Sequence, residues 1–213
     1  MACAFPVIAF VLAACGKHPT ETPPAVHAPT AKSTALAPAT ATTSAQPHET
    51  RATALQQACD GGNMASCSDL GSMYANGKDV ARDWARAVTL YKQACDGGHM
   101  LGCINLGDMI LPGKGIKNEP SRAIALYKQA CDGGEMSGCS SLGVMYKHGI
   151  AVRKDSARAL ALFKQACDGG EMLGCAALGG SYSDGFGVKK DPARATALYK
   201  QACNAGYVLA CGY

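Results

Sequence analysis

Aromatic side chains are scarce in this 213-residue sequence: they make up 6% of the residues, although 48% of the residues are hydrophobic. Small and flexible apolar residues, mostly alanine, leucine, methionine and cysteine, take their place. A core of large stacked rings is therefore excluded, and closely packed helices suit the composition better. Because such helices bury little apolar area per unit, we expect covalent crosslinks to supplement the core.

The sequence also lacks blocks of like charge. Its formal net charge of +4 results from 20 basic and 16 acidic residues that are interspersed along the chain. Nucleic-acid-binding domains usually concentrate lysine and arginine on one element or face. We therefore predict no nucleic-acid partner.

Residues for metal-dependent or triad catalysis are missing as well. Only two of the five histidines, His99 and His148, lie beyond residue 50. They cannot build a histidine-rich metal cluster, and no Ser/His/Asp arrangement can be identified. The S-x-x-K motif of serine β-lactamases, with its accompanying K-T-G-like strand, is also absent. The sequence thus predicts no catalytic residues, no metal ligands and no cofactor.

Repetition is what the sequence has in abundance. The stretch KQACDGGHMLGC, which begins at Lys92, returns with few changes at Lys128, Lys164 and Lys200, and a related copy begins at Gln56. The starting positions differ by 36 residues each time (92, 128, 164, 200). A fixed period of this length indicates a stack of two-helix units, each burying an apolar face on its neighbour.

Ten of the 12 cysteines occur in pairs eight positions apart. These pairs are Cys59 and Cys67, Cys95 and Cys103, Cys131 and Cys139, Cys167 and Cys175, and Cys203 and Cys211. Eight residues of a continuous helix span about 12 Å, whereas a disulfide tolerates about 7 Å between Cα atoms. A disulfide therefore requires a chain reversal inside each pair, where it would join the end of one helix to the start of the next.

Glycine pairs between the cysteines supply this reversal. We predict that Gly97, Gly133 and Gly169 end a helix in the left-handed conformation. The C-x7-C spacing differs from the C-x2-C spacing of structural zinc sites, and zinc would need two pairs to converge. The pattern therefore favours five disulfides within the repeats.

The two remaining cysteines, Cys3 and Cys15, lie in an apolar leader. Its hydrophobic run is too short to span a bilayer and long enough for an export signal. Leu12-Ala13-Ala14-Cys15 resembles the bacterial lipobox, in which the cysteine is lipidated. Gly16 follows this cysteine, and a glycine there resembles the pattern of lipoproteins that are passed on to the outer membrane. We predict a signal peptide over residues 1–14 and a lipid anchor at Cys15, with a plain secretory signal as the alternative.

The expected location is the cell envelope, at the outer membrane facing the periplasm, or outside the cell if the protein is secreted. Paired cysteines fit export, since disulfides persist in oxidising compartments. Residues 15–49 are rich in alanine, proline and threonine and lack hydrophobic periodicity, which predicts a disordered tether. Residues 50–213 would form four full repeats with half-units at both ends.

Each unit shows helix signals at fixed positions. Asp83, Asp155 and Asp191 are predicted N-caps of the second helix, and Glu119 is a weaker one. Ile110 and the proline at position 112 should end the first helix of the second unit early. One glycine in each first helix costs about 1 kcal/mol relative to alanine, so we expect a neighbouring helix to approach closely there. These glycines are Gly71, Gly107, Gly143 and Gly179.

Two columns of basic residues also recur. One contains Lys92, Lys128, Lys164 and Lys200, and the other contains Arg86, Arg122, Arg158 and Arg194. Local ion pairs, such as Asp83 with Arg86, favour a solvated face. The alternative is a basic ladder for an acidic ligand.

Three motifs carry a family resemblance: L-G-x-M-Y at Leu70–Tyr74 and Leu142–Tyr146, D-G-F-G-V from Asp184, and A-L-Y-K-Q-A-C from Ala125. They resemble Sel1-like repeats, which are relatives of the tetratricopeptide repeats. The cysteine pairs resemble the secreted, cysteine-rich branch of that family. The resemblance covers residues 50–213 and implies an all-α, right-handed α/α solenoid of 36-residue helix pairs, each turn stapled by a C-x7-C disulfide.

The resemblance also implies a function. An exported repeat scaffold of this kind would bind a protein or peptide on a concave face lined by the first helices. Because some cysteine-rich relatives are described as penicillin-binding or β-lactamase proteins, the alternative is a β-lactam-binding protein with hydrolase activity. Its ligand would then be a β-lactam or a peptidoglycan fragment.

The candidate groove consists of positions beside the apolar stripe that vary between units, as a binding surface would. A variable solvated face is the alternative interpretation. The positions are Ser68, Asp69, Ser72, Asn76, Ile104, Asn105, Asp108, Ser140, Val144, Lys147 and His148.

Overall fold

A computed structural model describes residues 47–111 and 117–212. The predicted signal peptide, the predicted lipid anchor at Cys15 and nearly all of the predicted tether lie outside these residues. The described part is helical and contains no strand. Its elements are α1 (Pro47–Asp60), α2 (Met64–Asn76), α3 (Trp84–Asp96), α4 (Met100–Met109), α5 (Pro120–Asp132), α6 (Met136–His148), α7 (Ser156–Asp168), α8 (Met172–Asp184), α9 (Pro192–Asn204) and the 3-10 helix η1 (Val208–Ala210).

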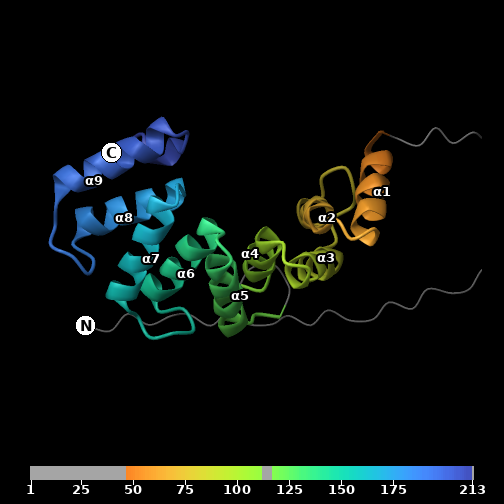
Figure 1. The fold of residues 1–213 in the computed structure, drawn as a ribbon, viewed down its shortest axis with the longest axis horizontal. Helices are drawn as coiled ribbons and strands as arrows, with labels where there is room; N and C mark the ends of the chain where they lie inside the picture. Colours follow the sequence, from red (N-terminus) through yellow and green to blue (C-terminus); the bar gives the residue numbers. More distant parts are fainter. Residues whose placement is uncertain (1–46, 112–116, 213) are drawn as a thin grey trace, which may run out of the picture. The chain divides into compact units, whose positions relative to one another are not determined.

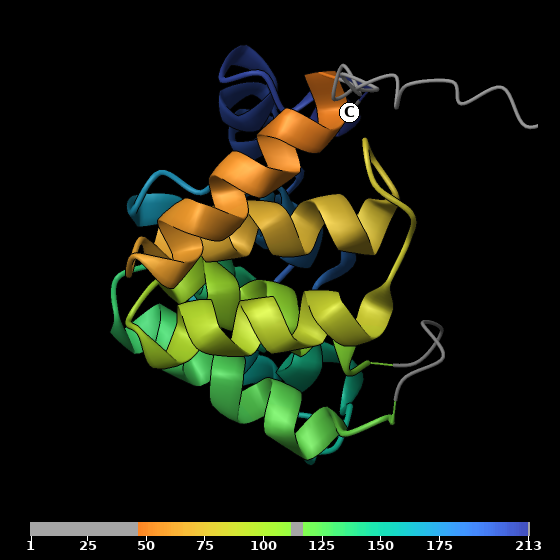
Figure 2. The same cartoon turned by 90° about the vertical axis from the view of Figure 1, so that its right-hand side faces the viewer.

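The helices follow the predicted repeat. The first helices of the units are α2, α4, α6 and α8, and the second helices are α3, α5, α7 and α9, preceded by the half-unit helix α1. Each helix packs against the next one along the chain, and α2 also contacts α4 as α6 contacts α8. Figure 2 shows the consecutive helices α1 to α3 side by side. The predicted α/α solenoid of stapled helix pairs is confirmed.

All five predicted disulfides form, with Cα–Cα distances between 4.4 and 4.9 Å. Every pair spans the turn from a second helix to the next first helix. The four pairs before the last are buried, whereas Cys211 of the last pair is exposed. The C-x7-C spacing therefore staples each unit to its successor, as expected.

The predicted conformation of the turn glycines is wrong in one respect. The second glycine of each pair is left-handed, with φ of 85° at Gly98, and the first is not, with φ of −80° at Gly97. The first glycine is required for a different reason, because the methionine that begins the first helix of the same unit packs against it. A Cβ at Gly97 would lie 2.3 Å from the Sδ of Met64. The equivalent contacts join Gly133 to Met100 and Gly169 to Met136.

The glycines inside the first helices do admit a neighbouring helix, as predicted. A Cβ at Gly107 would lie 2.6 Å from the ring of Tyr127, and one at Gly143 would lie 2.6 Å from the ring of Phe163. The small core residues of the second helices, such as Ala123 and Ala159, are fully buried. Close helix packing thus replaces large side chains through most of the core.

The predicted helix ends are also confirmed. The side chains of Asp83, Asp155 and Asp191 accept a hydrogen bond from a backbone N–H three residues later, whereas Glu119 makes no such cap. Helix α4 ends after 10 residues, whereas the other first helices have 13. Asp79 and Ala151 replace a loop glycine and still adopt positive φ, at 64° and 56°. The loop geometry is therefore kept without glycine at these positions.

Candidate functional site

Three of the predicted groove residues are buried and cannot present their side chains to a partner. Ser68, Ile104 and Ser140 are 4%, 7% and 0% exposed. They lie at equivalent positions, directly after the second cysteine of each pair, where successive units pack together. We name the other eight, which are exposed or half-buried, the candidate surface: Asp69, Ser72, Asn76, Asn105, Asp108, Val144, Lys147 and His148.

A hydrogen-bond network connects α2 and α4 within this surface. The Nδ2 of Asn105 donates to the Oγ of Ser68 over 3.3 Å, and the hydroxyl of Ser72 donates to the Ser68 carbonyl over 3.1 Å. Tyr91 on α3 donates its own hydroxyl to the Oγ of Ser72, also over 3.1 Å. The buried Ser68 therefore holds the side chain of Asn105 in place.

Asp108 on α4 is held by the second helix of its own unit. The hydroxyl of Tyr127, a side chain that is 1% exposed, donates to the Oδ1 of Asp108 over 2.6 Å. Burial, followed by this hydrogen bond and the nearby carboxylate charge, raises the pKa of Tyr127 well above its usual range. Burial also raises the pKa of Tyr91, and the charge of Asp108 adds to the effect. Both phenols therefore stay protonated and act as donors.

Each of the two tyrosine hydroxyls faces a polar side chain that accepts its hydrogen bond. Tyr91 faces Ser72, and Tyr127 faces Asp108. In the third unit, Val144 occupies the position of Ser72 and Asp108, and Phe163 replaces the tyrosine. In the first three units a polar surface residue thus goes with tyrosine and an apolar one with phenylalanine, whereas Tyr199 of the fourth unit faces Gly180. Sequence reasoning missed these partners, although the Tyr/Tyr/Phe/Tyr column at 36-residue spacing was visible.

The hydroxyl donors of the network bond within the protein, and the carboxylate of Asp108 is exposed. Tyr91, Tyr127, Ser72 and Asn105 each donate a hydrogen bond to an acceptor within the protein. The exposed Asp108 keeps its second carboxylate oxygen, and the half-buried Asn105 keeps its amide oxygen and one of its two N–H groups. The α4 part of the candidate surface therefore suits a partner that supplies N–H or ammonium groups.

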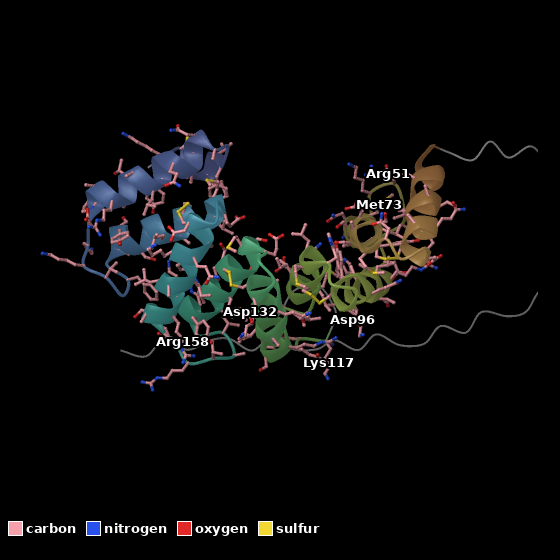
Figure 3. The ribbon with its side chains drawn as sticks, in the orientation of Figure 1. Arg51, Met73, Asp96, Lys117, Asp132 and Arg158 are labelled. Carbon is pink, nitrogen blue, oxygen red and sulfur yellow. A yellow bond between two sulfur atoms is a disulfide. The ribbon has the colours of Figure 1, made fainter. Side chains whose placement is uncertain are left out.

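A shallow hollow of about 180 Å³ adjoins this region at α2. Three candidate residues, Asp69, Ser72 and Asn76, line it. Sequence reasoning missed its other walls, Arg51 on α1, Met73 and Lys78. Figure 3 labels Arg51 and Met73, which lie together between α1 and α2. The α2 end of the candidate surface thus combines one carboxylate with two cations.

The third unit contributes residues of different character. Val144 is half-buried, and Lys147 and His148 occupy the last turn of α6. The ammonium of Lys147 lies 5.5 Å from the ring centroid of Phe186, which belongs to the loop between α8 and α9. Ser140, below this region, has no hydrogen-bond partner among the described residues, because Ala177 occupies the position that Asn105 has above Ser68.

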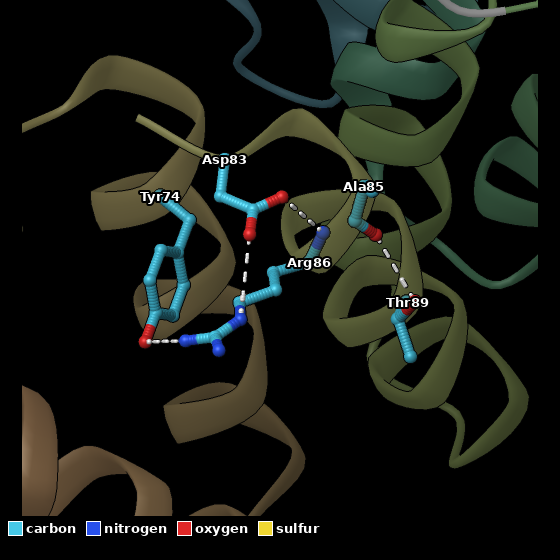
Figure 4. Close-up of polar contacts among 5 residues, drawn as sticks. All are labelled: Tyr74, Asp83, Ala85, Arg86 and Thr89. Atoms are coloured by element: carbon cyan, nitrogen blue, oxygen red, sulfur yellow. Dashed lines mark hydrogen bonds and ion pairs between the residues drawn. The ribbon is translucent and has the colours of Figure 1, made fainter. Parts of the chain in front are cut away.

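The recurrent arginines form local contacts. Arg86 forms a salt bridge with Asp83 at 3.3 Å and donates a hydrogen bond to the hydroxyl of Tyr74 at 3.1 Å (Figure 4). The guanidinium group of Arg86 also makes a cation–π contact with the Tyr74 ring. Arg158 and Arg194 repeat this arrangement. In the other column, the ammonium groups of Lys92, Lys128 and Lys164 each pair with an aspartate four residues later. The local-pair interpretation is therefore confirmed for these residues.

The described residues offer no group of three or more His, Cys, Asp and Glu side chains that could hold a metal ion. The repeat cysteines are committed to disulfides and cannot act as nucleophiles or zinc ligands in this form. Within the described ranges, no helix has the length and apolar character needed to cross a bilayer.

Comparison with known families matches four segments of the chain to the Sel1 repeat: residues 65–99, 101–135, 137–171 and 173–207. No curated protein sequence matches the chain. Among solved structures, a Sel1 repeat protein from Oxalobacter formigenes is similar, with a TM-score of 0.70 and 27% identity over 78% of this chain and 67% of that one.

Two further structures are similar. The protein c5321, a protective antigen of uropathogenic Escherichia coli with an SLR fold, has a TM-score of 0.67 and 28% identity over 75% of this chain. The match covers only 34% of that protein, so this chain spans about a third of its length. Helicobacter pylori cysteine rich protein B has a TM-score of 0.50 and 30% identity over 62% of this chain and 94% of that one.

Proposed function

The chain belongs to the Sel1 repeat family, and on that premise we propose that it is an exported scaffold that binds a protein or peptide in the bacterial cell envelope. The repeat solenoid is a fold typical of protein–protein interaction. The observation that carries the proposal is the network on α2 and α4, where buried tyrosines hold an exposed carboxylate. Preorganised polar groups of this kind lower the entropic cost of binding.

In this proposal the partner contacts the candidate surface. Its α4 part presents the carboxylate of Asp108, and its α2 part presents Asp69 beside Arg51 and Lys78. An extended peptide with a donor-rich segment, such as a lysine or arginine side chain, fits the α4 part. β-lactam hydrolysis remains the alternative, for which the described residues supply no assigned nucleophile.

A capture experiment tests the binding proposal. Asp108→Asn should weaken recovery of the envelope partner at least fivefold, because it removes the charge and keeps an oxygen for the Tyr127 hydroxyl. Asp69→Ala with Asn76→Ala should weaken capture too, since both side chains are exposed. Binding would be measured by quantitative pull-down from envelope extract, followed by titration with the purified partner.

The matched control is Gln129→Ala with Gln165→Ala, two exposed residues on second helices outside the candidate surface. Asp108→Ala is the wrong test variant, because it would leave the buried Tyr127 hydroxyl without an acceptor and so lower stability. Equal capture by surface and control variants would contradict the proposed site. Multiple turnovers of a chromogenic β-lactam by the oxidised, purified protein would favour the hydrolase alternative instead.

Export and lipidation form the second part of the proposal. The five disulfides indicate an oxidising environment, which the periplasm and the cell exterior provide. The lipobox-like sequence before Cys15 then suggests an anchor at the outer membrane.

We expect Cys15→Ala to move the protein from the detergent phase to the aqueous phase on partitioning, because the acyl chains would be lost. Intact mass would identify the new N-terminus and its acyl groups in the parent protein. A parent protein that is cleaved elsewhere and carries no acyl groups would disprove the anchor. The capture experiment would still stand in that case.

A further inference from the structure

The loop between α6 and α7 lies close to the equivalent loop between α8 and α9, which follows it by one 36-residue repeat. The loop from Gly149 to Asp155 carries Arg153 and Lys154, and the loop from Gly185 to Asp191 carries Lys189 and Lys190. Phe186 connects them: the ammonium groups of Lys147 and Lys154 lie 5.5 and 5.4 Å from its ring centroid. We name the five cations Lys147, Arg153, Lys154, Lys189 and Lys190 the basic loop patch.

The positive charge of this patch is not neutralised locally. The two loop carboxylates, Asp155 and Asp191, are already bound by Arg158 and Arg194 at 3.3 and 3.2 Å. No described carboxylate forms a salt bridge with any of the five cations. By contrast, Lys117, in the described part of the loop before α5, pairs with Glu119 at 3.0 Å. The last two loops therefore bring together five cations whose charge no described salt bridge offsets.

The same loops expose apolar surface beside the cations. Ile150 is 37% exposed, next to the exposed Ala151, which has positive φ. An open hollow of about 520 Å³ follows, lined by residues 152–158 together with Tyr146. Arg153 and Lys154 are two of its cationic walls. The patch thus combines cations that form no described salt bridge, an exposed aliphatic side chain and an open hollow that can admit a phosphate group.

We propose that the basic loop patch docks on an anionic phospholipid bilayer. Lysine and arginine would neutralise lipid phosphates, and Ile150 would enter the headgroup region, as interfacial apolar residues do. The exposed isoleucine favours a bilayer over a soluble polyanion, which would gain nothing from it. The proposal rests on the proposed envelope location, where the lipid anchor would keep the repeats close to such a surface.

The expected strength of binding to an anionic bilayer follows from the number of cations in the patch. Each lysine or arginine near an anionic bilayer strengthens binding by roughly fivefold, and salt weakens the effect. Sequence reasoning did not find this patch, because its charges are divided between two loops and neither forms a block. Only the stacking of units three and four brings them together around Phe186.

Vesicle binding tests the proposal on the full chain carrying Cys15→Ala, so that no acyl chain contributes. We expect binding to vesicles of phosphatidylcholine mixed with phosphatidylglycerol, and much weaker binding to phosphatidylcholine alone. The triple variant Arg153→Gln, Lys189→Gln, Lys190→Gln should reduce the binding at least tenfold. Its three side chains are exposed and make no described salt bridge, so helicity and disulfide mapping should not change.

The matched control is Lys92→Gln, Lys128→Gln, Lys164→Gln, which changes the net charge equally at other helices. It should bind the mixed vesicles like the parent chain. Equal weakening by the two triple variants would overturn the proposal, as would equal binding to both kinds of vesicle. Binding to heparin that Ile150→Ser leaves intact, without vesicle binding, would assign the patch to soluble polyanions instead. Each of these outcomes leaves the capture experiment on α2 and α4 unaffected.

Discussion

Reduction of all five disulfides should unfold the repeats at temperatures where the oxidised protein is fully helical. Each bridge closes a short loop, and a loop of about nine residues contributes on the order of 2.5 kcal/mol in the chain-entropy model. Domains are stable by only about 5–15 kcal/mol in total. The small-residue core leaves little in reserve, because alanine contributes little buried apolar area.

Removal of a single disulfide should lower the stability by an amount that depends on where the disulfide lies in the structure. Replacing Cys131 and Cys139 by alanine should cost about 2.5 kcal/mol or more, since both side chains are buried between packed units. The pair Cys203 and Cys211 is the matched control. It has the same spacing, but Cys211 is exposed and the pair holds only η1.

Urea titrations of oxidised, reduced and pair-deleted protein would measure these differences, with the circular dichroism signal of the helices as the probe. Peptide mapping without reductant would first establish that the remaining cysteines keep their partners. Equal losses for the inner and the terminal pair would contradict the assignment of the stability to unit-to-unit stapling. Cooperative unfolding of the fully reduced protein at the midpoint of the oxidised protein would contradict it too.

Much of this fold could be predicted from the sequence because its signals are local. The C-x7-C spacing requires a chain reversal, and aspartate before a helical run predicts a cap; the structure confirms both. The turn glycines show the limit of such reasoning. Local conformation explains Gly98, whereas the need for Gly97 comes from Met64, which lies at the start of the other helix of the unit.

The candidate surface was harder to predict for a related reason. Helical periodicity indicates which stripe is apolar, but not which flank of that stripe the next unit covers. Ser68, Ile104 and Ser140 lie on the covered flank and are buried. The contacts that orient Asp108 and Ser72 come from tyrosines on the next helix, 19 residues away. Only the packed structure brings those groups together.

Gly107→Ala should be among the most destabilising single substitutions in α4. The new Cβ would lie 2.6 Å from the Cε1 of Tyr127, a distance that real Cβ atoms essentially never show. The ring cannot move away easily, because it is 1% exposed and its hydroxyl is bound to Asp108. Overpacking costs about 1–3 kcal/mol, and the helix preference of alanine over glycine, about 1 kcal/mol, offsets only part of it.

Gly180→Ala on α8 is the matched control for this substitution. Its new Cβ would approach the Tyr199 hydroxyl to 3.3 Å, a tight contact that the half-buried ring relieves with a much smaller shift than Gly107→Ala requires of Tyr127, so the loss should be smaller. Thermal or urea unfolding would compare the two variants. Similar changes in stability for both would contradict the close-approach explanation of the glycine column.

A double-mutant cycle identifies the clashing group. In a Tyr127→Ala background the ring is gone, so Gly107→Ala should lose its penalty and become neutral or stabilising through helix propensity. Additive losses would show that the clash lies elsewhere. Since Tyr127 also orients Asp108, Gly107→Ala should weaken partner capture even under conditions where the variant remains folded. A repeat glycine buried below the surface would then determine, through one tyrosine, how the exposed carboxylate meets its ligand.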